Sequence, residues 1–282
     1  MTNKYFTVEV KPDIVMGDVS DVYASDDGID LNPDDLISDW TAVDVPRGAN
    51  AIRNLSLIVN NADGGNVNPA TDFVLIFAKE ANGVAPGSIK GSGFGNAPAF
   101  NGNIREHVIG AIKIEGTAAD TVGIIPTIND TFGFTMHQIG PGTGTNSTST
   151  TNISTIPLPM IIDLEPTSGT NVGFDKLYVA LINSTGTHSF ETNVLADYSS
   201  GAPAADSTTT IVVKTTDPRL LFSVGDSVYN GTKHGSTDTA IGVVKSLTAT
   251  SIELEANNAV AIANNDEIIN GNPIRITLGF ER

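Results

Sequence analysis

The chain has 282 residues, which is enough to bury a substantial core in one large domain or two unequal ones. Its 32 acidic residues against 15 Lys and Arg residues give a formal net charge of −17 at pH 7, so the surface repels nucleic-acid phosphates and anionic membranes. The chain has no cysteine, which excludes disulfides, thiolate metal sites and thiol nucleophiles.

The first predicted element is a strand over residues 5–10. Phe6, Val8 and Val10 alternate with polar residues, which is the period-two pattern of a half-buried strand. A secretory signal peptide would run apolar instead, so we expect none. No later stretch approaches the roughly 18 apolar residues of a membrane-spanning helix, and we therefore expect no membrane partner.

A short helix is expected over residues 32–40. Asn32 can cap its N-terminus, and Pro33 suits the first helical position. Asp34 and Asp35 would complement the positive end of the helix dipole. The pattern predicts a helix of about two turns.

The rest of the first two thirds of the chain predicts strands. Short apolar runs rich in β-branched residues are typical of strands buried between two layers. These runs cover residues 55–59, 73–78, 108–114, 160–164 and 177–182. Residues 132–136 and 274–280 alternate and predict half-buried strands, whereas residues 142–155 have low complexity and predict an exposed loop. The sequence thus predicts an all-β fold whose large domain is an antiparallel, jelly-roll-like β-sandwich.

A series of very short strands between residues 206 and 272 predicts a small β-barrel. The expected strands are 209–214, 220–222, 226–229, 240–246, 251–255 and 266–269. Residues 199–205 are expected to form the linker into the barrel. The strand at 274–280 is not needed to close a five-stranded barrel, so we expect it to return to the first domain. The predicted division is a large domain of residues 1–205 completed by residues 273–282, with the barrel of residues 206–272 inserted.

No catalytic constellation is evident. None of the four histidines lies at ligand spacing from another His or Glu; they are His107, His137, His188 and His234. No Gly-x-Ser-x-Gly elbow occurs, and the glycine-rich residues 91–95 lack the following helix that would hold a phosphate. We therefore expect no catalytic, cofactor-binding or metal-binding residues and no enzymatic activity.

Two chemical alternatives stay open. Three acidic clusters lie near the N-terminus, at Asp18 and Asp21, at Asp26, Asp27 and Asp30, and at Asp34 and Asp35. They do not match an EF-hand loop, and we interpret them as solvated loops, with calcium binding as the alternative. A carboxylate pair for glycoside hydrolysis could meet only in the fold. With one Trp and five Tyr, the chain offers few aromatic platforms for a sugar.

Three segments of the large domain are distinctive, namely residues 39–48 (DWTAVDVPRG), 77–79 (FAK) and 83–87 (GVAPG). They resemble segments of virion structural proteins of tailed bacteriophages, especially of marine cyanophages. Three segments of the predicted barrel are residues 222–229 (FSVGDSVY), 241–244 (IGVV) and 250–254 (TSIEL). They resemble the SH3-like barrels attached to phage head and tail proteins. The resemblance implies a structural role and names no active residues.

On this basis we expect a non-enzymatic outer capsid decoration or cement protein that binds the major capsid protein lattice. A net charge of −17 suits the outer surface of the virion, away from packaged DNA. Lattice sites are symmetric, so we expect a homo-oligomer, specifically a trimer. The candidate partner contact is strand addition at Tyr5, Phe6, Val8 and Val10. The alternatives are a tail or fibre component that binds host-surface glycans and a polysaccharide depolymerase.

Overall fold

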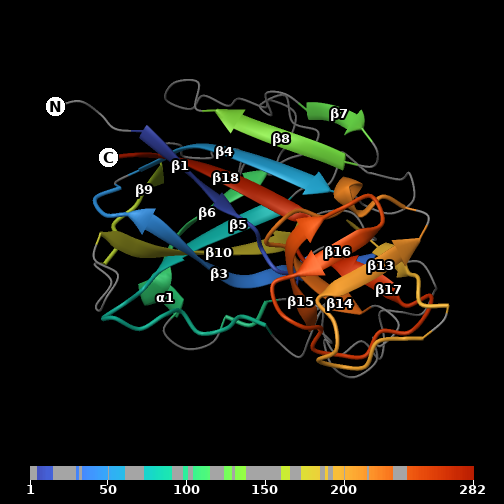
Figure 1. Ribbon diagram of the computed structural model, residues 1–282. Coiled ribbons are helices and arrows are strands. Elements are labelled where there is room, and N and C mark those ends of the chain that lie inside the picture. The colour runs from blue at the N-terminus through green and yellow to red at the C-terminus, as the bar shows by residue number, and fades with distance from the viewer. Residues whose placement is uncertain are drawn as a thin grey trace.

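The computed structural model describes residues 5–14, 30–31, 34–49, 51–60, 73–90, 98–100, 104–114, 124–128, 131–137, 160–165, 173–184, 188–189, 193–199, 201–214, 216–230 and 240–282. Nearly all its regular elements are strands, and all named strand pairs are antiparallel. The predicted all-β, antiparallel fold class is therefore confirmed. Two packed sheets form one body, and a closed barrel lies beside them (Figure 1).

Among the described residues, the first sheet contains six strands. In spatial order they are β1 (Tyr5–Val10), β18 (Ile274–Glu281), β4 (Ala51–Asn60), β8 (Thr131–His137) and β7 (Ile124–Ile128), and β9 (Met160–Ile161) also pairs with β4. Strand β18 is thus central, although it is the last strand of the chain. It pairs with β1 on one side and with β4 on the other.

The second sheet contains four strands. Their order is β3 (Leu36–Pro46), β10 (Phe174–Asn183), β5 (Phe73–Lys79) and β6 (Val108–Ile114). A short helix, α1 (Ile104–His107), leads directly into β6. A separate pair joins β2 (Asp30–Leu31) to β11 (His188–Ser189).

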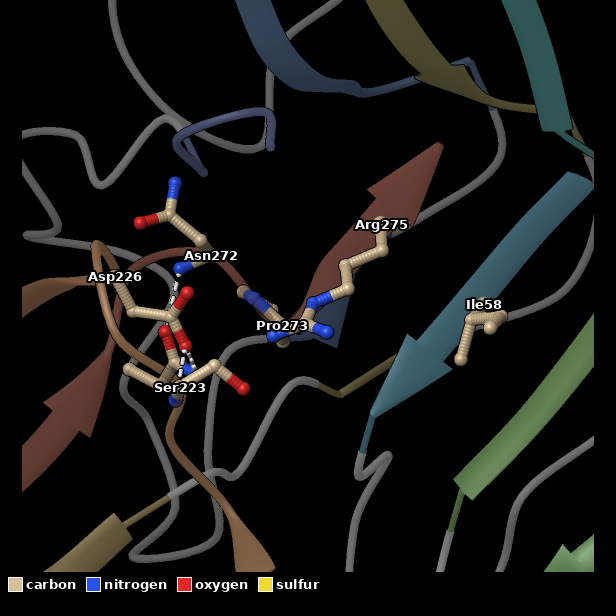
Figure 2. A pocket seen from close by; sticks show the side chains of 7 residues that line it. Ile58, Ser223, Asp226, Asn272, Pro273 and Arg275 are labelled. Atoms are coloured by element: carbon tan, nitrogen blue, oxygen red, sulfur yellow. Dashed lines mark hydrogen bonds between the residues drawn. The ribbon is translucent and has the colours of Figure 1, made fainter. Parts of the chain in front are cut away.

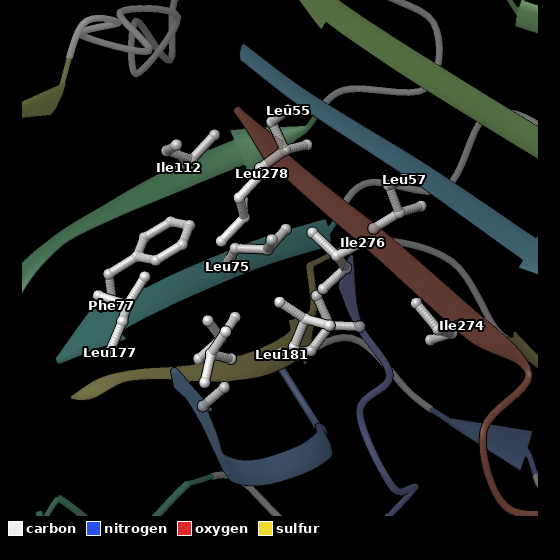
Figure 3. Packing of buried hydrophobic residues seen from close by; sticks show 14 of the residues in the cluster. Leu55, Leu57, Leu75, Phe77, Ile112, Leu177, Leu181, Ile274, Ile276 and Leu278 are labelled. Atoms are coloured by element: carbon white, nitrogen blue, oxygen red, sulfur yellow. The ribbon is translucent and has the colours of Figure 1, made fainter. Parts of the chain in front are cut away.

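The core lies between the two sheets, where apolar side chains from both inner faces meet (Figure 3). Ile274, Ile276 and Leu278 of β18 and their neighbours in β4 face residues such as Leu75 of β5 and Leu181 of β10. All of these side chains are fully buried. Because burying one such side chain contributes about 1.5–3 kcal/mol, this layer is the main source of stability of the sandwich.

The expected helix over residues 32–40 is wrong where the structure describes it, because Leu36 to Trp40 lie in strand β3. Strand β3 pairs with β10 along most of its length, with a bulge opposite Leu181. Leu36 and Ile37 are both fully buried at this end of the strand. Long-range pairing and burial outweigh a local signal of two turns, since an isolated helix of that length is not stable.

The barrel closes with six strands rather than the expected five. Their order is β12 (Asn193–Ala196), β13 (Thr210–Lys214), β16 (Ser251–Leu254), β15 (Ala240–Leu247), β14 (Ser227–Asn230) and β17 (Glu267–Asn270). The barrel core is a separate apolar cluster that includes Val194, Ile211, Val228 and Ile252. The barrel begins before the predicted boundary at residue 206, because β12 pairs with β13 and β17.

Two smaller barrel predictions also differ from the structure. The strand expected at residues 220–222 is replaced by a 3₁₀ helix, η2 (Pro218–Leu220), which Asp217 caps by accepting a hydrogen bond from the Arg219 amide. Residues 199–205 connect two barrel strands and do not link the two domains. Buried Asn258 holds this segment by donating to the Ala204 carbonyl at 2.8 Å.

Candidate functional site

A small pocket lies at the junction between the sandwich and the barrel (Figure 2). Its volume is about 120 Å³. It is lined by Ile58 from β4, Pro273 and Arg275 at the start of β18, and four polar residues of the barrel and its exit, namely Ser223, Asp226, Asn270 and Asn272. This lining brings a buried carboxylate, Asp226, together with two buried amide side chains, Asn270 and Asn272.

Asp226 is the buried carboxylate of this pocket, with 2% of its surface exposed. It ends a tight turn in which Gly225 has φ = 86°, a conformation that suits glycine. One carboxylate oxygen accepts from the Ser223 amide at 2.7 Å and from Asn270 Nδ2 at 3.0 Å. The other accepts from Lys11 Nζ at 2.8 Å. Both oxygens are therefore occupied, as burial of a charge requires.

The two asparagines of the barrel exit are also saturated. Asn272 Oδ1 accepts from the Ser227 amide at 2.6 Å, and its amide nitrogen donates to the Pro12 carbonyl at 3.0 Å. The Asn272 backbone donates to Asn270 Oδ1 at 2.7 Å. The buried carboxylate and the two amide side chains that line the pocket thus have hydrogen-bond partners within the protein, and this pattern is typical of a structural junction rather than of a site awaiting a substrate.

Sequence reasoning did not single out Lys11, Asn270 or Asn272. Lys11 and Asp226 lie far apart in the chain, so no local spacing marks their contact. The available signal was the segment at residues 222–229, which the sequence pattern assigned to a barrel. Gly225 and Asp226 of this segment form the turn described above. Glycine suits the backbone conformation of that turn, and aspartate supplies its buried hydrogen-bonding carboxylate.

The histidines do not converge in the part of the chain that the structure describes. His107 is buried, and its Nδ1 lies 2.9 Å from the Lys79 carbonyl, within hydrogen-bonding distance. His137 and His188 lie in β8 and β11, and His234 lies outside the described residues. Across those ranges, no three His, Asp or Glu side chains gather as metal ligands would.

Other predicted features fall wholly or partly outside the described residues. These are the acidic clusters between residues 18 and 27, the glycine-rich residues 91–95 and the loop at 142–155. Of the remaining acidic residues, Asp35 is buried and its backbone carbonyl accepts from the Asn183 amide at 2.9 Å. Where the backbone is described, no helix has the length and apolar character needed to cross a membrane.

The predicted partner contact lies on β1, at one end of the first sheet. Phe6 and Val8 are half-buried and pack against the core, and Val10 is fully buried. Tyr5, in contrast, is 66% exposed. A partner that binds β1 would therefore contact the Tyr5 side chain and the outer backbone edge of the strand, while the other three side chains hold β1 in place.

Trp40 is the single tryptophan and a possible sugar platform, but the structure uses it for packing. Its ring packs against the sandwich core, and its Nε1 donates to the Gly87 carbonyl at 2.9 Å. The neighbouring Asp39 carboxylate accepts from the Ile89 amide at 3.1 Å. These contacts bind the segment after β5 to strand β3. Trp40 therefore links that segment to the second sheet.

One titratable group is strongly perturbed, although it lies away from the pocket. Burial, the hydrogen bond to Glu80 and the negative charge of Glu80 together raise the pKa of Tyr178 in β10 to about 12, and burial is the largest of these causes. The Tyr178 hydroxyl donates to Glu80 Oε1 at 2.9 Å. An acid with a raised pKa in the folded state stabilises the fold while it stays protonated.

We therefore expect stability to fall as pH rises from about 10 through about 12, and this fall should be smaller in Tyr178→Phe. The contribution is complete below the unfolded pKa and is lost as pH passes the folded pKa. Chemical denaturation at a series of alkaline pH values measures the effect. Tyr5→Phe, at an exposed position, serves as the control and should keep the wild-type profile. An unchanged profile in Tyr178→Phe would contradict the prediction.

No family model matches the chain, and no curated protein matches it either. The function proposed below therefore rests on the short sequence segments named above and on the geometry of the described residues. That geometry offers a body of two packed sheets, a strand at the edge of one sheet and a junction whose buried carboxylate and amide side chains have partners within the protein.

Proposed function

We propose that this protein is a non-enzymatic virion structural protein that decorates and stabilises the outer surface of a phage capsid. The proposal combines two arguments. Short segments of both domains resemble phage virion proteins, and the fold is suited to docking on a repeated surface. The buried carboxylate and amide side chains of the junction pocket already have hydrogen-bond partners within the protein, which supports a structural role over a catalytic one.

The strand order of the sandwich is the observation that carries the proposal. Without β7 and β9, the two sheets have the orders β1-β18-β4-β8 and β3-β10-β5-β6. Along the chain, successive strands change sheet at every step except from β5 to β6. This double Greek-key order supports a jelly roll, an architecture found in viral capsid and lectin domains. We also propose that the barrel is SH3-like, because its segments at residues 222–229, 241–244 and 250–254 resemble SH3-like barrels.

Strand β1 is the contact that we propose for the capsid lattice. It has a single strand neighbour among the described residues, β18, so its other edge offers backbone groups for strand addition. Tyr5 adds an exposed aromatic ring beside that edge. Aromatic rings of this kind often dominate the binding energy of a protein interface.

The charge and symmetry of the particle complete the proposal. A net charge of −17 would be repelled by packaged DNA but favours solubility on the outside of the shell. Copies that bind equivalent lattice sites gain from avidity when they associate, which favours a homo-oligomer, with a trimer as the expected form. Trp40 is used in packing, so the site geometry favours this role over glycan binding by a tail or fibre.

The test is a binding experiment with isolated phage heads that lack the protein. Purified protein is added, the heads are pelleted, and bound copies and the disruption temperature of the heads are measured. We expect saturable binding and a raised disruption temperature. Absence of binding to heads would overturn the capsid proposal, and a glycan-binding assay with and without calcium would then test the tail or fibre role.

A pair of exposed apolar positions locates the contact. Tyr5→Ala should weaken binding to heads by roughly tenfold or more, since an exposed aromatic anchor is lost. Ile161→Ala in β9 is the matched control, because Ile161 is 77% exposed on the same sheet but is separated from β1 by β4 and β18. Equal affinity in the two variants would rule out β1 as the docking strand and leave the capsid role to be judged by the wild-type result.

A further inference from the structure

Residues 11–14, which directly follow β1, run from the sandwich onto the barrel. We call this segment the strap. Its four residues are Lys11, Pro12, Asp13 and Ile14. Each of them contacts the barrel or the barrel exit through a hydrogen bond.

The side chains of the strap make two contacts with the barrel. Lys11 Nζ donates to the buried Asp226 carboxylate and to the Val224 carbonyl, both at 2.8 Å. Asp13 Oδ2 accepts from the Tyr229 hydroxyl at 2.7 Å. Lys11 thus binds the turn before β14, and Asp13 binds a side chain of β14 itself.

The backbone of the strap makes a second set of contacts with the barrel exit. The Ile14 amide donates to the Gly271 carbonyl at 2.8 Å. Asn272 Nδ2 donates to the carbonyls of Lys11 at 3.3 Å and Pro12 at 3.0 Å. The strap is therefore paired with the chain just before β18, so it lies between the two domains at the point where the chain returns to the sandwich.

Apolar packing continues across the same junction. Ile14 of the strap is buried in the sandwich core. Ile269 of barrel strand β17 belongs to that core too, and the ring of Tyr229 packs against it. The sandwich core thus extends into the barrel wall instead of ending at a solvated boundary.

We propose that the strap locks the barrel and the sandwich into one rigid body, with the barrel held in a fixed orientation relative to β1. Domains of one chain ordinarily move relative to each other unless their interface is large and apolar. Here a shared core and a saturated polar network replace the usual flexible linker. The inference concerns mechanics alone and does not depend on the proposed capsid role.

Gly271 provides a way to loosen the strap without removing any polar group. A methyl group there would overlap the Tyr229 ring and lie 2.6 Å from Asp13 Oδ1, so Gly271→Ala acts as a wedge between strap and barrel. Gly87→Ala is the matched control, because no atom lies within 4 Å of the added methyl group. Both substitutions add the same methyl group, one inside the junction and one in open space.

The absence of cysteine allows two specific labels. Ala85→Cys in the sandwich and Ala249→Cys in the barrel introduce cysteines at exposed positions that can carry nitroxide labels. Pulsed electron paramagnetic resonance then measures the distribution of distances between the domains. We expect one narrow distribution in the labelled full-length protein and in Gly87→Ala, and a distribution at least twice as wide in Gly271→Ala.

A broad distribution in the labelled protein without further change would overturn the proposal, and so would an unchanged width in Gly271→Ala. Circular dichroism checks that this variant is folded. If it is not, the double variant Lys11→Met with Tyr229→Phe removes two strap contacts without adding a wedge. It should also widen the distribution, and failure to do so would equally refute a locking role for the strap.

Discussion

Replacing Phe280 with alanine should lower the free energy of unfolding of the sandwich by about 3–5 kcal/mol. Phe280 lies in β18, is fully buried, and pairs with Phe6 of β1 and Ile52 of β4. Its ring stacks on Phe6 with centroids 5.3 Å apart. The substitution therefore leaves a cavity in the core beside β1 and removes an aromatic contact between two strands.

Urea denaturation followed by Trp40 fluorescence measures this loss, because Trp40 is the single tryptophan and lies in β3 of the sandwich. Thr277→Ala on the same strand is the control, since Thr277 is half-buried and contributes no large apolar side chain. We expect a loss for Thr277→Ala well below that for Phe280→Ala. Similar losses in the two variants would mean that β18 does not supply the core of the sheet.

Asp226→Ala should destabilise the protein by about 3 kcal/mol, at the lower end of the range for breaking a buried ion pair. The substitution leaves the Ser223 amide and Asn270 Nδ2 without the acceptor that they bind in the structure. It also removes the partner of Lys11 Nζ, although Lys11 keeps 23% side-chain exposure and can turn toward water. That partial exposure is why we expect the lower end of the range.

The control for this prediction is Asp44→Ala. Asp44 pairs with Lys176 at 2.5 Å, but its side chain is 47% exposed, and such surface pairs contribute at most about 1 kcal/mol. Calorimetry of wild type and both variants compares the two ion pairs directly. A loss for Asp226→Ala no greater than that for Asp44→Ala would show that the junction network adds no more stability than an ordinary surface pair.

Much of the sandwich could be predicted because its strands carry local patterns. The alternation of Ile274, Ile276, Leu278 and Phe280 predicted β18, and each of these side chains faces the core. The nearly continuous apolar runs predicted β5 and β10, which lie inside the second sheet with a strand on either side. Strong patterns of this kind arise because burial on one or both faces repeats along the whole strand.

The failures come from short or conflicting patterns. The helix expected at residues 32–40 was wrong because a favourable N-terminal cap is a local signal, whereas the pairing of β3 with β10 is not visible in the sequence. Strand β12 is only four residues long, too short for a periodic pattern. The boundary of the barrel was therefore set too late in the chain.

The junction was harder to predict than either domain. Its contacts join Lys11 and Asn272 to residues of distant segments, and each polar side chain alone is typical of an exposed turn. Only the fold brings them together and removes water from Asp226. The candidate contact at β1 was located by its pattern, but the sequence did not show that Tyr5 alone of its four residues is well exposed.

The central place of β18 determines the order in which the protein can form during synthesis. Tyr5 pairs with Glu281, so β1 and β18 must meet before the first sheet is complete. Strand β18 leaves the ribosome after every described barrel strand has emerged. The barrel, whose strands are neighbours in sequence, can fold while the chain is still attached, whereas β1 and β4 wait for their shared partner. Completion of the sandwich is thus a step that follows synthesis of the barrel.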